Sequence, residues 1–137
     1  MHSLSLLVLV VAWSGAQAAG GGGGVVDYQY VLRATGDPAV LIIDVRSPAE
    51  VSDLGSIPSS INIPLNDVHM ALGAMPAARF LALYGRPKPA RDAELIVYCT
   101  VGIRAARAQQ TAASLGYTNV KNYRGSYTDW VKQQQQQ

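Results

Sequence analysis

The chain contains little cysteine and histidine, and this scarcity excludes several kinds of site. Its 137 residues include one cysteine, Cys99, and two histidines, His2 and His69. A single cysteine cannot form an internal disulfide bond, and these three residues lack the spacing of a structural zinc site. We therefore expect no metal site and no disulfide framework.

The sequence also lacks clustered charge of one sign and a long hydrophobic run. Its formal net charge is +2, and residues of both signs are scattered along it. Nucleic-acid-binding domains usually carry a clustered basic face, so we expect no nucleic-acid partner. The apolar run from Leu4 to Trp13 is about half as long as the ~20 residues that cross a bilayer, which predicts no membrane span.

The ends of the chain differ in composition from its centre. The apolar run is followed by Ala16-Gln17-Ala18, the pattern of a signal-peptide cleavage site, although no Lys or Arg precedes the run. The alternative is an apolar N-terminus buried in the fold. We predict a signal peptide over residues 1–18, a glycine-rich tether over 19–24, a folded domain over 25–132 and a disordered glutamine tail over 133–137. The protein would then be secreted or enter the secretory pathway, with a cytoplasmic location as the alternative.

Short apolar runs in the central segment predict strands that are buried on both faces. Residues 38–45 and 94–98 are rich in β-branched residues and uninterrupted by polar ones until their ends, and residues 61–63 and 119–123 are weaker candidates. Helical patterns lie between these runs. The alternation predicts an α/β domain with a central, mostly parallel sheet flanked by helices.

Capping residues predict where the helices begin and end. Ser47, Pro48 and Glu50 have the order of an N-cap, a first helical residue and the third residue of a capping box. The other predicted helices run from Asn66 or Asp67 to Leu72, from Pro76 to Tyr84, from Ile103 to Leu115 before Gly116, and from Ser126 to Lys132.

Cys99 lies where a predicted buried strand passes into the strongest predicted helix. Ligands of parallel α/β sheets bind beyond the carboxyl ends of the strands, so the thiol is expected at that edge. Gly102 permits a tight turn whose N–H groups, together with the N-terminus of the following helix, stabilise a thiolate. Arg104 adds a planar guanidinium suited to an oxyanion. The pattern predicts a nucleophilic sulfur that attacks an anionic substrate.

Two other interpretations of this loop remain open. A cysteine after a buried strand can be a small core residue without chemistry. A cysteine phosphatase or an enzyme similar to arsenate reductase would need an arginine six positions after the cysteine, and that position is Ala105. Because Arg104 comes one residue earlier, the loop is tighter and better suited to a sulfur atom than to a phosphoryl group.

Several segments together resemble single-domain rhodaneses, which are sulfurtransferases. The resemblance spans residues 25–132. The segments that carry it are LIIDVRSPAE, GSIPSSINIPL, LIVYCTVGIRA and SLGYTNVKNYRGSYTDW, while MPAARFLALYGRPKP resembles the thiosulfate:glutathione branch. Three serines depart from the family pattern: Ser56 stands where histidine is frequent, and Ser59 and Ser126 stand where glycine is usual.

The resemblance implies a rhodanese-like fold and a role for each residue of the loop. Cys99 would take up a sulfane sulfur from thiosulfate or a similar donor and pass it, through a persulfide, to glutathione, another thiol or cyanide. This chemistry needs no metal or organic cofactor. The backbone amides implied to cradle the persulfide are those of Thr100, Val101, Gly102, Ile103 and Arg104, and the Arg104 side chain is implied to hold the anionic donor.

Asp44 and Arg46 would support the site as a structural pair. Direct substrate contact, and a surface ion pair or helix cap without a role in the site, remain alternatives. Trp130 is expected in the core. The chain is expected to act as a monomer. The alternative function is a catalytically idle rhodanese module that binds a partner or senses redox state.

Overall fold

The computed structural model describes residues 23–137. The predicted signal peptide and the tether as far as residue 22 lie outside the described residues. Within the described part, no helix has both the length and the apolar character needed to cross a membrane.

The described chain folds around one five-stranded sheet in which all neighbouring strands are parallel. The order of the strands is β1-β5-β4-β2-β3. Their bounds are β1 Val25–Val26, β2 Val40–Asp44, β3 Ile61–Asn62, β4 Glu94–Tyr98 and β5 Val120–Tyr123. The two strands predicted most strongly, β2 and β4, are neighbours near the centre, which explains why their sequences are apolar without alternation.

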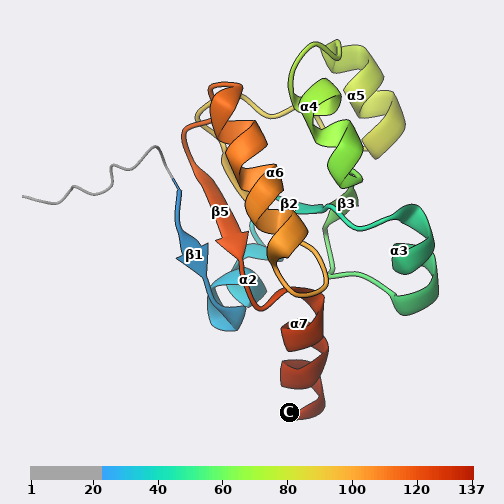
Figure 1. Ribbon diagram of the computed structural model, residues 1–137, viewed down its shortest axis with the longest axis vertical. Coiled ribbons are helices and arrows are strands. Elements are labelled where there is room, and N and C mark those ends of the chain that lie inside the picture. The colour runs from blue at the N-terminus through green and yellow to red at the C-terminus, as the bar shows by residue number, and fades with distance from the viewer. Residues whose placement is uncertain (1–22) are drawn as a thin grey trace, which may run out of the picture.

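The described part also contains six α-helices and one 3-10 helix, and all but the last, α7, lie between strands in the sequence (Figure 1). They are α2 Tyr28–Ala34, α3 Pro48–Leu54, the 3-10 helix η4 Leu65–Asp67, α4 Val68–Leu72, α5 Ala77–Tyr84, α6 Ile103–Ser114 and α7 Ser126–Gln135. The predicted capping box of α3 is present: the Glu50 N–H donates to Ser47 Oγ, and the Ser47 N–H donates to the Glu50 carboxylate.

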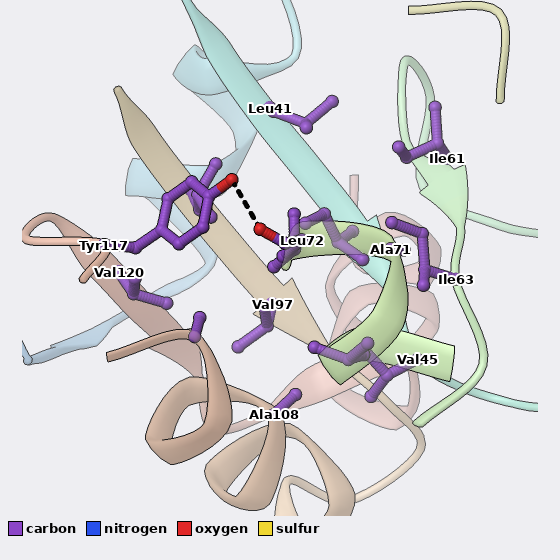
Figure 2. Close-up of a cluster of buried hydrophobic side chains, with 14 of the residues drawn as sticks. Leu41, Val45, Ile61, Ile63, Ala71, Leu72, Val97, Ala108, Tyr117 and Val120 are labelled. Carbon is purple, nitrogen blue, oxygen red and sulfur yellow. Dashed lines mark hydrogen bonds between the residues drawn. The ribbon is translucent and has the colours of Figure 1, made fainter. Parts of the chain in front are cut away.

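Two hydrophobic clusters form the core, one on each face of the sheet. Helices α4, α5 and α6 cover the face that carries Leu41 and Val97, and Figure 2 shows these side chains packed together with Ala71 and Ala108. Helices α2 and α7 cover the opposite face, where Trp130 packs against Tyr28 at 5.1 Å between ring centroids. The predicted α/β fold with a parallel sheet is therefore confirmed, and so is the core position of Trp130.

The structure differs from the sequence prediction at both ends of the domain. Neither β1 nor α2 was predicted, because β1 has two residues and α2 is a seven-residue helix that includes two tyrosines and a valine, which are weak helix formers. An N-cap starts α2: the Tyr30 N–H donates to Asp27 Oδ1.

The prediction of a disordered tail from Gln133 is wrong for its first residues, since α7 continues to Gln135. Glutamine has a high helix propensity, so it readily extends a helix that packing already stabilises. The side-chain amides of Gln134 and Gln137 also donate to Tyr28 Oη, which fixes this segment against α2.

Candidate active site

The loop between β4 and α6 lies at the carboxyl edge of the sheet and is held by the start of α7. The Cys99 N–H donates to Ser126 Oγ at 3.1 Å. The carbonyl groups of Cys99 and Thr100 accept the N–H groups of Tyr127 and Thr128, at 2.8 and 3.1 Å. These hydrogen bonds join segments nearly thirty residues apart, so the position of the thiol depends on how α7 packs.

The thiol of Cys99 is buried and faces hydrogen-bond donors. Its Sγ accepts the N–H groups of Gly102 at 3.1 Å and Ala105 at 3.4 Å, and Ser126 Oγ lies 3.9 Å away. Backbone donors that converge on one sulfur at the start of a helix stabilise negative charge there. The side chains of Val101 and Ile103 are exposed, and the Ala105 N–H is a donor that the sequence analysis did not assign.

Gly102 has a backbone conformation that the loop requires. Its φ angle is +96°, and a Cβ atom built there would lie 2.5 Å from the Arg124 carbonyl oxygen. Any other residue would therefore be strained and would also displace the chain after β5. Arg124 was not predicted as a site residue, because the contact joins two segments that only the fold brings together.

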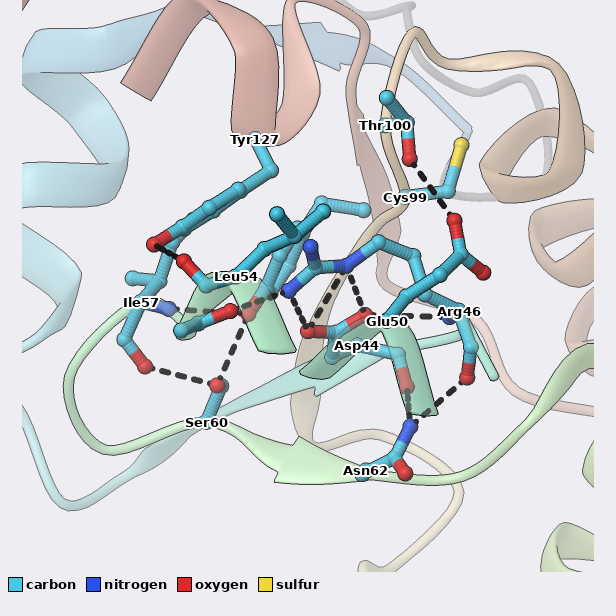
Figure 3. Close-up of polar contacts among 12 residues, drawn as sticks. Asp44, Arg46, Glu50, Leu54, Ile57, Ser60, Asn62, Cys99, Thr100 and Tyr127 are labelled. Carbon is cyan, nitrogen blue, oxygen red and sulfur yellow. Dashed lines mark hydrogen bonds and ion pairs between the residues drawn. The ribbon is translucent and has the colours of Figure 1, made fainter. Parts of the chain in front are cut away.

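Arg104 is paired with Glu50, a residue that the sequence analysis assigned only to helix capping. The Arg104 guanidinium donates Nη1 to Glu50 Oε1 at 2.7 Å and Nη2 to Oε2 at 3.0 Å. Nη2 also donates to Thr100 Oγ1 at 3.1 Å, and that hydroxyl donates to Glu50 Oε2 at 3.3 Å. Figure 3 shows the Glu50 carboxylate directed at Thr100, beside Cys99.

The ion pair keeps both groups charged. The hydrogen bond from Arg104, followed by that from the Ser47 backbone, holds the pKa of Glu50 well below its ordinary value of 4.5. The hydrogen bond to Glu50 outweighs partial burial and raises the pKa of Arg104, and the charge of Cys99 makes a smaller contribution in the same direction. About a third of each side chain is exposed, so solvent screening keeps the net stabilisation modest.

Asp44 and Arg46 form a second ion pair beneath the loop. Arg46 donates Nε and Nη2 to the Asp44 carboxylate, with Nη2 at 2.6 Å from Oδ2, and Nη2 also donates to the Gly55 carbonyl at 2.7 Å. Its guanidinium lies 4.3 Å from the centre of the Tyr127 ring. Burial lowers the pKa of Arg46, but the bonds to Asp44 outweigh this and raise it. Both residues have 0% exposure, which suits a support for the loop rather than a surface that receives substrate.

Comparison with known proteins identifies the family to which this architecture belongs. A profile of the rhodanese-like domain matches residues 27–133. The chain belongs to the rhodanese-like family. It is 38% identical over 107 residues to the rhodanese domain-containing protein CG4456 of Drosophila melanogaster, covering 78% of this chain and 96% of that one. It is 43% identical over 94 residues to the human thiosulfate:glutathione sulfurtransferase, covering 68% and 80% of the two chains.

A solved structure agrees with these relatives. The rhodanese superposes on the human single-domain sulfurtransferase TSTD1 with a TM-score of 0.73 and 37% identity, covering 79% of this chain and 95% of that one. The resemblance inferred from the sequence motifs is thereby confirmed. The protein is a rhodanese-type sulfurtransferase.

Two of the three serines that depart from the family pattern have the backbone conformation of a glycine. Among residues 23–137, Ser59 and Ser126 are the non-glycine residues with positive φ, at 67° and 59°. In this rhodanese both turns therefore carry local backbone strain. At Ser126 two hydrogen bonds of the side chain offset this strain. The hydroxyl accepts the Cys99 N–H and donates to the Tyr123 carbonyl at 2.8 Å.

Two grooves border the loop of the rhodanese. One, of about 380 Å³, is lined by Arg46, Leu54, Thr100, Tyr127, Thr128 and Val131. The other, of about 190 Å³, is lined by Val45, Ser47, Pro64, Leu65, Asn66 and Arg104. Within the described residues, no group of three or more His, Cys, Asp or Glu side chains is arranged to hold a metal ion.

Proposed function

We propose that this rhodanese moves a sulfane sulfur from thiosulfate through a persulfide on Cys99 to a thiol acceptor such as glutathione. The observation that carries the proposal is the pair of backbone N–H groups, from Gly102 and Ala105, aimed at Cys99 Sγ. The same kind of substrate appears in the name of the human relative, a thiosulfate:glutathione sulfurtransferase.

The first half of the reaction forms the persulfide. The Cys99 thiolate attacks the outer sulfur of thiosulfate, a bond forms between the two sulfur atoms, and the sulfur–sulfur bond of thiosulfate breaks to release sulfite. The terminal sulfur of the persulfide then carries the negative charge. The N–H groups around Sγ and the Arg104 guanidinium stabilise the anionic species along this path.

The second half returns the enzyme to its starting state. The acceptor thiolate attacks the outer sulfur of the persulfide, which yields the persulfide of the acceptor and the free Cys99 thiolate. The sequence has no second cysteine that could receive this sulfur, so the acceptor is a separate molecule. A covalent intermediate between two displacements predicts ping-pong kinetics.

Mass spectrometry of the intact protein tests this function. The reduced chain is treated with thiosulfate and then with glutathione, and its mass is measured at each stage. We expect a gain of about 32 Da, one sulfur atom, that glutathione removes. Cys99→Ser is the control, because the change is nearly isosteric and should leave the fold unchanged while abolishing the gain. A folded, reduced protein that gains no mass would contradict the proposal and favour an idle module.

The same measurement tests the N-terminal prediction. We propose that residues 1–18 are a signal peptide and that the protein is directed to the secretory pathway. The starting mass of the protein isolated from cells that express the full sequence would then correspond to a chain that begins at Ala19. A starting mass that includes residues 1–18 would contradict cleavage.

A further inference from the structure

Glu50 receives hydrogen bonds from three parts of the active-site region. Its Oε1 accepts the Ser47 N–H at 3.0 Å and Arg104 Nη1 at 2.7 Å. Its Oε2 accepts Arg104 Nη2 at 3.0 Å and Thr100 Oγ1 at 3.3 Å. One carboxylate therefore links the first turn of α3, the residue after the nucleophile and the first turn of α6. A residue needed only to cap α3 would make just the first of these contacts.

We propose that Glu50 is a positioning residue for persulfide formation, which it promotes by holding Arg104 and Thr100 in place around the loop. This inference rests on the proposed function and adds a residue to it. The carboxylate does not touch the sulfur that is transferred; it acts through Arg104. An unpaired arginine on the surface samples many rotamers, whereas a guanidinium bound through both terminal nitrogens has one orientation before the donor arrives.

Arg104 keeps donors for a substrate while it is paired. A guanidinium has five N–H bonds, and the contacts with Glu50 and Thr100 involve only Nη1 and Nη2. Its Nε makes no hydrogen bond to another residue of the described chain. Arg104 also lines the groove of about 190 Å³ beside the loop. The remaining N–H groups are therefore available to an anion that enters this groove.

The charge of Glu50 allows a positioning role to be distinguished from a role in attracting the anionic donor. The negative charge of Glu50 offsets the positive charge of Arg104, so the pair attracts a dianion less than a lone arginine would. Neutralising Glu50 should thus leave thiosulfate binding unchanged or strengthen it, while the lost orientation slows the chemical step. If Glu50 had a purely structural role, its neutralisation would not slow the chemical step while leaving thiosulfate binding unchanged or stronger.

The test measures the two halves of the reaction separately in the full chain. Persulfide formation on Cys99 is followed by rapid quench and intact mass over a series of thiosulfate concentrations, and sulfur removal by glutathione is followed from the preformed persulfide. For Glu50→Gln we expect the maximal rate of persulfide formation to fall about tenfold, the half-saturating thiosulfate concentration to stay equal or fall, and the glutathione step to change less than twofold.

Asp27→Ala is the matched control. It removes the N-cap of α2, which lies outside both grooves that border the loop, so it should lower the thermal midpoint and leave the rate of persulfide formation unchanged. Glu50→Asp provides a second variant that keeps the charge but withdraws the carboxylate by one methylene, and it should show the same slow first step. In an Arg104→Gln background, Glu50→Gln should cause little further loss, because its effect passes through Arg104.

The outcomes separate this inference from the function on which it rests. Normal maximal rates of persulfide formation in folded Glu50→Gln or Glu50→Asp protein would overturn the positioning role, even with an active parent chain. An equal loss of rate in Asp27→Ala would also overturn it, since a general loss of stability would then explain the effect. Absence of a persulfide in the parent chain would overturn the proposed function and the positioning role together.

Discussion

At the scale of single residues, the Cys99 loop depends on a few positions that have a left-handed backbone conformation and close contacts with neighbouring segments. Gly102 is one, because its positive φ and its closeness to the Arg124 carbonyl both exclude a side chain. Ser126 is another, since its left-handed backbone places a hydroxyl on the Cys99 N–H. Strain at such positions is tolerated where the surrounding contacts hold it in place.

The Gly102→Ala substitution tests the requirement at the loop. The left-handed backbone alone should lower the free energy of unfolding by about 1–2 kcal/mol, and the contact with Arg124 should add to this and displace the N–H that faces Cys99. Unfolding in urea and the rate of persulfide formation provide the two measurements. Gly85→Ala is the control, because Gly85 also has positive φ but a Cβ there would meet open space. Equal rates for the two variants would contradict the role assigned to Gly102.

At the scale of elements, α3 and α6 are joined across the loop by the ion pair of Glu50 and Arg104. The sequence predicted the beginnings of both helices correctly, because caps and first-turn residues are local signals. Their pairing is not local, as 54 residues separate the two side chains. Each helix brings one partner of the pair to the loop in its first turn.

The pairing makes the stability of the protein dependent on pH in the acid range. The pKa of Glu50 is lower in the folded protein than its ordinary value of 4.5, so protonation disfavours the folded state. The stability that this carboxylate contributes is complete above about pH 4.5 and is lost as the pH falls toward the folded pKa. Urea unfolding of the parent chain and of Glu50→Gln at pH 7, 4 and 3 should show a smaller loss on acidification in the variant. An identical loss in both would contradict this effect.

At the scale of the whole molecule, the helix α7 closes one face of the sheet and also supports the active site. Trp130 fills the core between α7 and α2. The first residues of the same helix bind the carbonyl groups of Cys99 and Thr100. Packing on the far side of the sheet is therefore coupled to the position of the thiol.

Substitution of Trp130 by alanine tests this coupling. Loss of a large buried ring should lower the free energy of unfolding by about 3–5 kcal/mol, and the loosened α7 should also slow persulfide formation in protein that remains folded. Leu83→Ala is the control: Leu83 lies on α5 with 52% exposure, and its loss should change stability by less than about 0.5 kcal/mol. A rate of persulfide formation in folded Trp130→Ala equal to that of the parent chain would show that α7 does not influence the loop.

The sequence alone determined the features that depend on neighbouring residues. These are the buried central strands, the capped helices, the turn at Gly102 and the Cys99 loop that led to the rhodanese family. Local patterns did not reveal the short elements β1 and α2, and they wrongly predicted disorder at Gln133, because packing against the rest of the fold stabilises these segments.

Only the tertiary structure decided which distant side chains meet at the site. Glu50 reaches Arg104, Ser126 reaches the Cys99 N–H, and the Arg124 carbonyl closes over Gly102. These contacts arise because all the strands are parallel, so the segments that follow β2, β4 and β5 converge at one edge of the sheet. The Cys99 loop is thus encoded locally, whereas the contacts that support it are a consequence of strand order.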